Sequence, residues 1–520
     1  MRTINYTIRT ALVLTICAFV FSACTDTYEK DIATSNVQTR KLILTPEEYV
    51  SIAYDNPQEL SEKDIIEVIN DFQSIASQFK GEATTKGTNA IQANTISKYY
   101  LTNNNTIDRR NITHSIDNSK LNIPIYEVEL SKNGNQKDFA IVCGDERAPK
   151  VLFYANDYET SSNEDNVGMR YLMEIAKLSS IEDIESIEEI KLLKRDSTLN
   201  KVSKELNIPK DQITRDFIKT KITTNENVTT REHNPIGGTT TPSGRILSII
   251  PSMSNIAWHQ EAPYNKQIPK GLRADGVGSY YEDNYPVGCA NIAIASLFSI
   301  LQPIMVGVTS NGREILIDWD YITSSRSLNS SSPAKMAEMA SSLLRTIYNR
   351  TFSDPKYAVI KTYDEDNNPI NIKVVTETTT TIQNMINYIK VVATYSGGTN
   401  AKFNPNTVLN SLLDQKPVLL FGNGHFVDKN HQPIDDPIYD STPGHGWLID
   451  GYCLAKKSGQ ARNDQYWSVN MGWGKNSSYI YFKTQDNFQD CDVTFPYNDE
   501  GVNITYYTQE QCMIYNIVKR

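Results

Sequence analysis

The sequence predicts an α+β fold made of more than one domain. At 520 residues the chain is longer than one ordinary core. Hydrophobic residues make up 39% and charged residues 22%, which is typical of a folded globular chain. Runs with helical spacing and short alternating runs both occur, and they are grouped along the chain rather than strictly alternating. These three observations favour segregated helices and antiparallel strands.

Residues 1–23 predict a signal peptide. An apolar run from Ala11 to Phe21 follows two arginines and is too short to span a bilayer. The Phe-Ser-Ala-Cys segment that ends at Cys24 resembles a bacterial lipobox, so we expect acylation of Cys24, with simple secretion as the alternative. Residues 24–44 would be the tether. The expected location is the cell envelope, at the outer membrane or cell surface, or outside the cell if processing releases the protein.

Residues 45–220 are expected to form a first α+β domain. The first helix is predicted by Thr45, a capping residue followed by proline and two acids, and the second by apolar residues at helical spacing. Period-two alternation and short apolar runs predict the strands. The expected elements are helices at 45–53 and 61–79 and strands at 123–130, 139–143 and 151–154.

A charged segment, 181–206, carries isoleucines at three-residue spacing. It predicts an amphipathic helical hairpin or a helix that covers another element, the plain alternative being a solvated helix. Residues 221–245 are rich in Thr, Asn and Gly and cannot bury much apolar surface. We interpret them as an interdomain linker and the region of activation cleavage.

Residues 246–520 are expected to form the second domain, with a helical half followed by a twisted antiparallel half. The expected helices are 289–301, 334–351, 381–394 and 405–413, and the expected strands are 418–421, 447–454, 466–469, 479–482 and 511–517.

Composition excludes some classes of partner. The net charge is -10, and no Lys/Arg-rich stripe is present to follow a phosphate backbone, so nucleic acid is not expected as a partner. No later segment has the ~20 consecutive apolar residues of a membrane-spanning helix. No metal or cofactor motif is found, and none is predicted.

Cys289 is the strongest nucleophile candidate. Of seven cysteines, Cys17 and Cys24 fall in the signal region, and the remaining odd number leaves at least one thiol free. Cys289 follows a Pro-Val-Gly turn and opens an apolar helical segment, where the helix dipole lowers a thiol pKa and free backbone N–H groups can hold an oxyanion. A buried structural cysteine is the alternative.

His445 is the best candidate for a general base among six histidines. It precedes an apolar strand and has glycine on both sides, which lets another side chain approach closely. Asn470 and Trp473 end a later strand and could orient and shield an imidazole. Gln260 could supply an amide donor to an oxyanion hole. Taken singly, each is as easily a structural histidine, a core tryptophan or a surface amide.

Four ordered segments together resemble the streptopain family of papain-like cysteine peptidases. They are Trp258-His259-Gln260-Glu261-Ala262-Pro263-Tyr264-Asn265, Pro286-Val287-Gly288-Cys289, Gly444-His445-Gly446-Trp447 and Asn470-Met471-Gly472-Trp473-Gly474. The earlier run from Phe139 to Pro149 resembles the propeptide of that family.

The resemblance implies a papain-like peptidase domain at 246–520, preceded by an inhibitory propeptide domain at 45–220. It implies a cysteine endopeptidase made as a zymogen, with proteins or peptides as substrates and its own propeptide as intramolecular inhibitor. It implies no cofactor. The site roles are Cys289 as nucleophile, His445 as base, Gln260 as oxyanion donor, and Asn470 with Trp473 as the orienting pair.

Two features depart from the family pattern. Met471 stands where the family usually has tryptophan, and the region 421–443 is longer than expected before the histidine. This insert carries His425 and His431 among several aspartates. A metal site built from these residues and His445 is therefore one rival interpretation, although no helical His-x-x-x-His or Cys-x-x-Cys spacing supports it. A non-catalytic surface lipoprotein that keeps the fold for binding is the other.

Overall fold

The computed structural model describes residues 41–79, 92–102, 122–131, 137–156, 158, 167–224, 245–274, 279–363, 369–428, 432, 434, 444–456, 463–474, 478–483, 493–496 and 503–520. It divides the chain into two units, Met1–Lys41 and Leu42–Arg520, and all the elements below belong to the second. The predicted signal peptide, Cys24 and most of the tether lie outside the described residues.

The elements before residue 225 are β1 (Leu42–Leu44), α2 (Pro46–Ala53), α3 (Glu62–Phe79), β2 (Gln92–Thr102), β3 (Asn122–Ser131), β4 (Lys137–Cys143), β5 (Lys150–Ala155), α4 (Val167–Leu206), the 3-10 helix η3 (Lys210–Gln212), α5 (Arg215–Lys221) and β6 (Ile222–Thr224). Helix α2 starts as its sequence predicts, because Thr45 and Glu48 form a reciprocal capping box. The predicted strands are β3, β4 and β5.

Helix α4 is a single helix of 40 residues. Of the two structures considered for 181–206, it adopts the covering helix and not the hairpin. Ile181, Ile184 and Ile187 are buried, whereas Leu192 and Leu193 are 79% and 75% exposed. The spaced isoleucines therefore mark the part of α4 that packs on the sheet, and the exposed leucines lie on a later turn.

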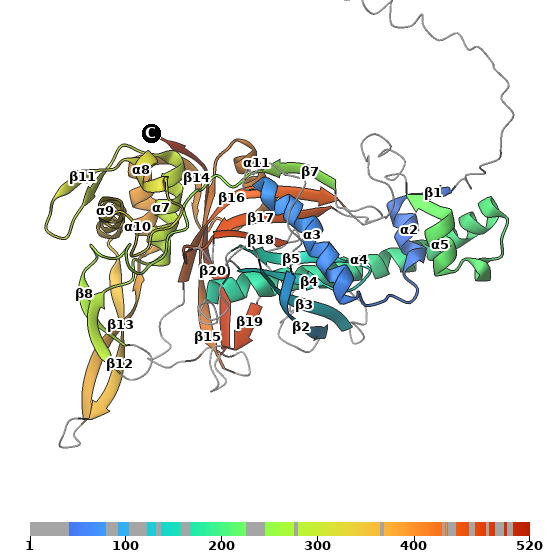
Figure 1. The fold of residues 1–520 in the computed structure, drawn as a ribbon, viewed down its shortest axis with the longest axis horizontal. Helices are drawn as coiled ribbons and strands as arrows, with labels where there is room; N and C mark the ends of the chain where they lie inside the picture. Colours follow the sequence, from blue (N-terminus) through green and yellow to red (C-terminus); the bar gives the residue numbers. More distant parts are fainter. Residues whose placement is uncertain are drawn as a thin grey trace, which may run out of the picture. The chain divides into compact units, whose positions relative to one another are not determined.

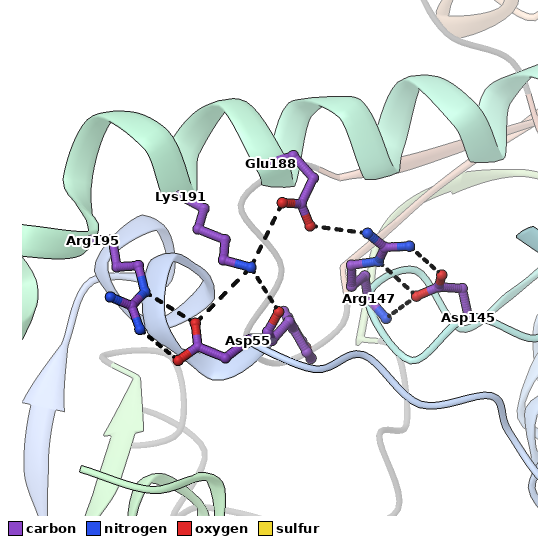
Figure 2. A network of polar contacts seen from close by, with 7 residues as sticks. Asp55, Asp145, Arg147, Glu188, Lys191 and Arg195 are labelled. Atoms are coloured by element: carbon purple, nitrogen blue, oxygen red, sulfur yellow. Dashed lines mark hydrogen bonds and ion pairs between the residues drawn. The ribbon is translucent and has the colours of Figure 1, made fainter. Parts of the chain in front are cut away.

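A polar network fastens α4 to two turns (Figure 2). Arg147, in the turn between β4 and β5, contacts Asp145 at 2.6 Å and reaches Glu188 on α4 at 2.9 Å. Further along α4, Arg195 pairs with Asp55, just after α2, at 2.6 Å. The Arg147 pairs are largely shielded from water, so they hold the turn more firmly than surface ion pairs would.

The elements after residue 244 are β7 (Arg245–Ile250), β8 (Lys270–Ala274), β9 (Tyr280–Asn284), α7 (Cys289–Leu301), β10 (Val306–Val308), β11 (Glu314–Leu316), α8 (Trp319–Thr323), α9 (Ala334–Arg350), β12 (Asp354–Tyr363), β13 (Pro369–Thr379), α10 (Ile382–Val392), β14 (Ala393–Thr399), α11 (Pro405–Leu413), β15 (Val418–Val427), β16 (Gly444–Lys456), β17 (Asp464–Asn470), β18 (Ser478–Lys483), β19 (Val493–Pro496) and β20 (Asn503–Lys519). Helices and mostly antiparallel sheets confirm the predicted α+β class, and the arrangement is compatible with a papain-like domain. Among the described helices, none is long and apolar enough to cross a membrane.

One 12-stranded sheet runs through both parts of the chain. Its order is β14-β20-β15-β16-β17-β18-β5-β4-β3-β2, with β19 also on β20 and β7 also on β16. The junction is antiparallel pairing of β18 with β5, so the blue-green and orange strands in Figure 1 form one sheet. The predicted boundary between the domains, 221–245, falls mainly outside the described residues.

Alternation along the strands separates two hydrophobic cores. On β16, Leu448 joins the core formed with α7, α9 and α10, the helices grouped together in Figure 1. Its neighbours Trp447 and Ile449 join the other core, which also contains residues of β3, β5 and α4. The helical half of the second part thus covers one face of β16, and the opposite face shares its core with the first part.

A buried ion triad lies at the same junction. Lys150 of β5 is 2.6 Å from Asp464 of β17 and 3.0 Å from Asp183 of α4. All three side chains are at most 8% exposed. Burial disfavours the charge on Lys150, but the two carboxylates outweigh it and raise its pKa. The triad therefore ties β5 and α4 to β17 by charges that are largely shielded from water.

Candidate active site

Cys289 lies at the first residue of α7, as predicted. The helix is buried from Ala290 to Ser299, and this apolar run is what fixes it against the sheet. Its N-cap, Gly288, has φ +93°, and a Cβ there would lie 3.1 Å from the carbonyl oxygen of Thr378. Only glycine suits both the positive φ and the close approach. The turn therefore places the thiol at a helix N-terminus.

Buried hydrogen bonds of Asn291 hold the turn that precedes Cys289. Asn291 donates to the carbonyl of Val287 at 2.8 Å and to Ser353 at 2.9 Å, and Thr351 donates to Asn291 at 2.9 Å. All of these groups are buried. A fully bonded buried network keeps one conformation, so the start of α7 is rigid.

His445 is the second residue of β16, and the chain approaches α7 at this point. A Cβ on Gly446 would lie 3.3 Å from Cα of Ala290 and 2.6 Å from the ring of Phe421. The glycine after the histidine is thus required by contact between β16 and α7, as the sequence pattern predicts. His445 itself is only 6% exposed.

The structure brings the Cys289 sulfur against the backbone on both sides of His445. Its Sγ is 3.9 Å from the carbonyl oxygen of Gly444, within the range of a sulfur hydrogen bond. The backbone N–H of Gly446 donates to the same sulfur, and the N–H groups of Cys289 and Ala290 also contact it. Two segments that are distant in sequence therefore meet at the thiol.

The imidazole of His445 is oriented by a backbone carbonyl. Its Nε2 lies 3.1 Å from the carbonyl oxygen of Met471 and 3.3 Å from Nε1 of Trp473. These contacts require opposite tautomers, since an indole N–H only donates and a carbonyl only accepts. The shorter contact favours Nε2–H bonded to Met471, which leaves Nδ1 as the basic nitrogen. Sequence reasoning missed this partner because a main-chain carbonyl has no residue signature.

Two indole rings flank the imidazole. Trp473 stacks with its ring centroid 5.6 Å from that of His445, and Trp447 at 6.0 Å, both close to parallel. Aromatic faces attract a cation, so these rings favour the protonated imidazole when it forms. The predicted shielding role of Trp473 is consistent with this placement.

The side chain of Asn470 has other partners than the one predicted. Its Nδ2 donates to the carbonyl of Ile256 at 2.9 Å and contacts Ser296 of α7 at 3.4 Å. Its Oδ1 accepts from the N–H of Gly472 at 3.0 Å. The structure therefore places Asn470 near the site but engages both ends of its amide elsewhere than at His445.

Gln260 lies beside the start of α7. Its Oε1 accepts from the N–H of Gly288 at 3.0 Å, and its carbonyl accepts from the N–H of Val287 at 2.9 Å. Because Oε1 is engaged, Nε2 is the end of the amide that remains to donate to a substrate oxygen. This is the end that the predicted oxyanion role requires.

We expect Gln260→Ala to lower kcat about 10²- to 10³-fold with little change in KM, the effect of removing one oxyanion donor. Gln267→Ala is the matched control. The Gln267 side chain accepts from the N–H of Ser310 in an exposed turn, so its loss should leave the rate within twofold. Hydrolysis of a fluorogenic peptide would measure both variants, and equal rates for the two would refute the assignment.

Burial keeps both reacting groups neutral in this state of the chain. It raises the pKa of the Cys289 thiol to about 11, with a further contribution from the carboxylate of Glu377. It lowers the pKa of His445 to about 4, against the contact with Met471. Both shifts favour a neutral thiol and a neutral imidazole over an ion pair.

This electrostatic state predicts how the intact chain reacts with iodoacetamide. Only the thiolate is alkylated, so the rate at Cys289 should rise roughly tenfold per pH unit from pH 6 to pH 10 and reach no plateau near neutrality. Peptide mass spectrometry on the unprocessed chain, separated by size, would follow the label. A fast rate that is flat between pH 5 and pH 8 would mean that the ion pair is already formed.

Asp450, five residues after His445 on β16, is a site residue for which sequence analysis made no prediction. It is 1% exposed and accepts from Ser252 at 2.6 Å, from the N–H of Ser254 at 2.8 Å and from Ser468 at 3.1 Å. Burial raises its pKa to about 6, although these neutral donors lower it. In the sequence, the signal for this buried acid is an aspartate that directly follows the apolar strand residues 447–449.

The raised pKa of Asp450 makes folding stability depend on pH. Its folded-state pKa is about 6 against an ordinary 3.8, so its contribution is complete below the ordinary value and is lost as pH rises through 6. The loss is about 3 kcal/mol. The free energy of unfolding of wild type minus that of Asp450→Asn, measured in urea, should fall by roughly this amount from pH 4 to pH 7. If the two proteins differ in the free energy of unfolding by the same amount at pH 4 and pH 7, this role of Asp450 is wrong.

The rival metal centre falls mostly on residues that the structure does not describe. The side chain of His425, together with His431 and most of 429–443, lies outside the described residues. Within the residues that are described, no group of three or more His, Cys, Asp or Glu side chains is placed to hold a metal ion.

A thiol at a helix N-terminus, set against an antiparallel strand whose second residue is a histidine, defines a site of the thiol-hydrolase class. Residues 258–481 match the model of the Peptidase C10 family, the streptopain family, and this region of the chain belongs to that family. It is a family of cysteine endopeptidases, so the chain is a cysteine peptidase with proteins or peptides as substrates. The chain has no match among curated proteins.

Proposed function

We propose that the protein is an exported cysteine endopeptidase, made as an inactive precursor, in which Cys289 is the nucleophile and His445 the base. The observation that carries the assignment is the position of the Cys289 sulfur between the backbones of Gly444 and Gly446, the two neighbours of His445. Membership of the streptopain family supports it independently.

The proposed reaction is acyl transfer. The thiol proton moves to Nδ1 of His445 as the sulfur attacks the substrate carbonyl carbon, and the oxyanion accepts hydrogen bonds from Gln260 Nε2 and the N–H of Cys289. The imidazolium then protonates the leaving amine, which leaves a thioester on Cys289. Water, deprotonated by His445, attacks the thioester, and the thiol and the acid product are released.

Residues 45–220 are proposed to be the inhibitory propeptide. Two observations support this. The pKa values of Cys289 and His445 favour neutral groups in the intact chain, which is the less reactive state. The sheet and core of this region are continuous with those of the peptidase part. Cleavage within 221–245 would break the covalent link between the two regions. The surroundings of Cys289 and His445 could then change.

The N-terminus is proposed to anchor the protein. Export through the signal at 1–23 and acylation of Cys24 would attach it to the bacterial cell envelope, at the outer membrane or the cell surface. Cleavage within 221–245 would then release the peptidase domain if the propeptide leaves with the anchor. Metabolic labelling with a fatty acid, compared between wild type and Cys24→Ala, tests the anchor directly.

Labelled casein tests the activity. Residues 25–520 should release dye from fluorescein-labelled casein. Iodoacetamide should abolish this activity, and a chelator should leave it unchanged. Size and N-terminal sequence followed over time should show cleavage within 221–245. Chelator-sensitive hydrolysis would favour the metal site, and absence of any hydrolysis after processing would favour a binding lipoprotein.

A further inference from the structure

An extended segment, residues 252–258, connects the two halves of the site. It follows β7, whose residues pair with β16 from Arg245 to Ile250, and it leads directly to Gln260. We call this segment the strap. It is hydrogen-bonded to Asp450 in the middle of β16 and to Asn470 at the end of β17, so its position depends on those two residues.

Asp450 holds the first turn of the strap. The carboxylate accepts from Ser252 Oγ and the Ser254 N–H, and its own backbone carbonyl accepts from the N–H of Met253 at 3.1 Å. A Cβ on the adjacent Gly451 would lie 3.1 Å from the N of Ser252, so the strap and β16 are in direct contact here. Three consecutive residues are thus bound to one aspartate.

The rest of the strap is bound at every second residue. The carbonyl of Ile256 accepts from Asn470, and the carbonyl of Trp258 accepts from the N–H of Gly474 at 3.0 Å. Trp258 is fully buried and packs on Tyr264 with ring centroids 5.4 Å apart. These bonds link the strap to β17 and to the turn after it, so its parts move together.

The far end of the strap reaches the nucleophile. Gln260 bonds Val287 and Gly288 through its carbonyl and its Oε1, one residue before Cys289. The strap therefore joins the strand that carries His445 to the turn that carries Cys289. A shift at the Asp450 end would be passed to the amide of Gln260 through bonded backbone.

We propose that Asp450 is a positioning residue for the peptidase reaction, which sets the oxyanion donor Gln260 through the strap. The inference rests on the proposed function, since it assigns Asp450 to the same site. It gives Asn470 the same kind of role, at the middle of the strap. An error of about 1 Å in a donor is enough to lower a rate strongly, so anchors that touch no substrate can matter to the chemistry.

A double-mutant cycle tests whether Asp450 acts through Gln260. Asp450→Asn should lower kcat on a fluorogenic peptide about tenfold with KM within twofold. In a Gln260→Ala background the same substitution should change kcat by less than twofold, because the group being positioned is already gone. A tenfold loss in both backgrounds would mean that Asp450 does not act through Gln260, and the proposal would fail.

Two serines on the same carboxylate give a matched control that keeps Asp450 in place, since each variant removes one donor to it. Ser252→Ala removes a bond to the strap, and Ser468→Ala removes one to β17. We expect Ser252→Ala to lower kcat about three- to fivefold and Ser468→Ala to leave it within twofold. Equal effects of the two would overturn the proposal even if Asp450→Asn fails to fold.

Failure of the proposed function gives a different result. In that case the wild-type chain, once processed, would hydrolyse neither casein nor peptide in a manner sensitive to iodoacetamide. Failure of the inference leaves wild-type hydrolysis intact and affects only the comparison of the serine variants and the double-mutant cycle.

Discussion

Replacing Cys289 by alanine is expected to reduce peptide hydrolysis by about 10⁴-fold or more and to abolish self-processing. Without the sulfur no thioester can form, and only the donors and substrate binding remain. The alanine keeps the small volume of the site at the helix start, so the fold should be unchanged. Casein hydrolysis would measure the activity, and the size of the purified chain over time would measure processing.

Cys453→Ala is the control for this prediction. Cys453 is another free thiol, on β16 itself, and it is buried in a core away from the site. Its loss should leave hydrolysis and processing at or near the wild-type level. Normal hydrolysis by Cys289→Ala, or equal loss in both variants, would end the assignment of the nucleophile.

Replacing Lys150 by methionine is expected to lower the free energy of unfolding by about 3–5 kcal/mol. The substitution removes the cation that Asp183 and Asp464 share, and each carboxylate is at most 8% exposed. Buried carboxylates that lose a cation stay ionised only at a large penalty. Urea unfolding of the Cys289→Ala chain, which stays unprocessed, would measure the loss.

Two comparisons isolate the cause. Lys63→Met removes a lysine that pairs with Glu67 at 4.0 Å, with the lysine side chain 84% exposed, and should change stability by less than about 0.5 kcal/mol. Lys150→Met combined with Asp183→Asn and Asp464→Asn removes all the buried charge and should recover much of the loss. If the triple variant is no more stable than Lys150→Met, the loss comes from packing and not from charge.

Much of the fold could be predicted from the sequence, because the long elements carry strong local signals. Helix α7 has the predicted bounds, 289–301, and α11 the predicted 405–413. The apolar run of α7, and the Asn404 cap and Pro405 of α11, are local signals that the sequence carries directly. The strand cores of β15 to β18 were also predicted, but β15, β16 and β20 are longer in the structure than their apolar runs.

Other elements could not be predicted, because their pairing is decided by contacts that are distant in sequence. The β12–β13 ribbon is an exception, because its pairing is local and Ile370, Ile372 and Val374 of β13 alternate with polar residues; sequence analysis missed it. The pairing of β18 with β5 joins residues more than 300 positions apart, and no local pattern encodes it. Sheet register of this kind is set by burial in the finished fold.

The candidate site divides in the same way. Cys289, His445 and Gln260 were predicted from residue type and motif order, and the structure brings the thiol, the strand of the histidine and the amide together. The carbonyl of Met471 could not be predicted, since every residue has one. Asp450 was visible as an acid in an apolar strand, but only the fold shows that its partners lie on the strap.

The pairing of β18 with β5 has a consequence for the activated enzyme. If the region before residue 225 departs, the backbone N–H and C=O groups of β18 that now face β5 lose their partners. An open strand edge is a template for main-chain bonding to any extended chain that reaches it. Activation would therefore leave an unpaired strand edge on the mature molecule. A membrane-proximal protein, a second enzyme or the released region before residue 225 could pair with it.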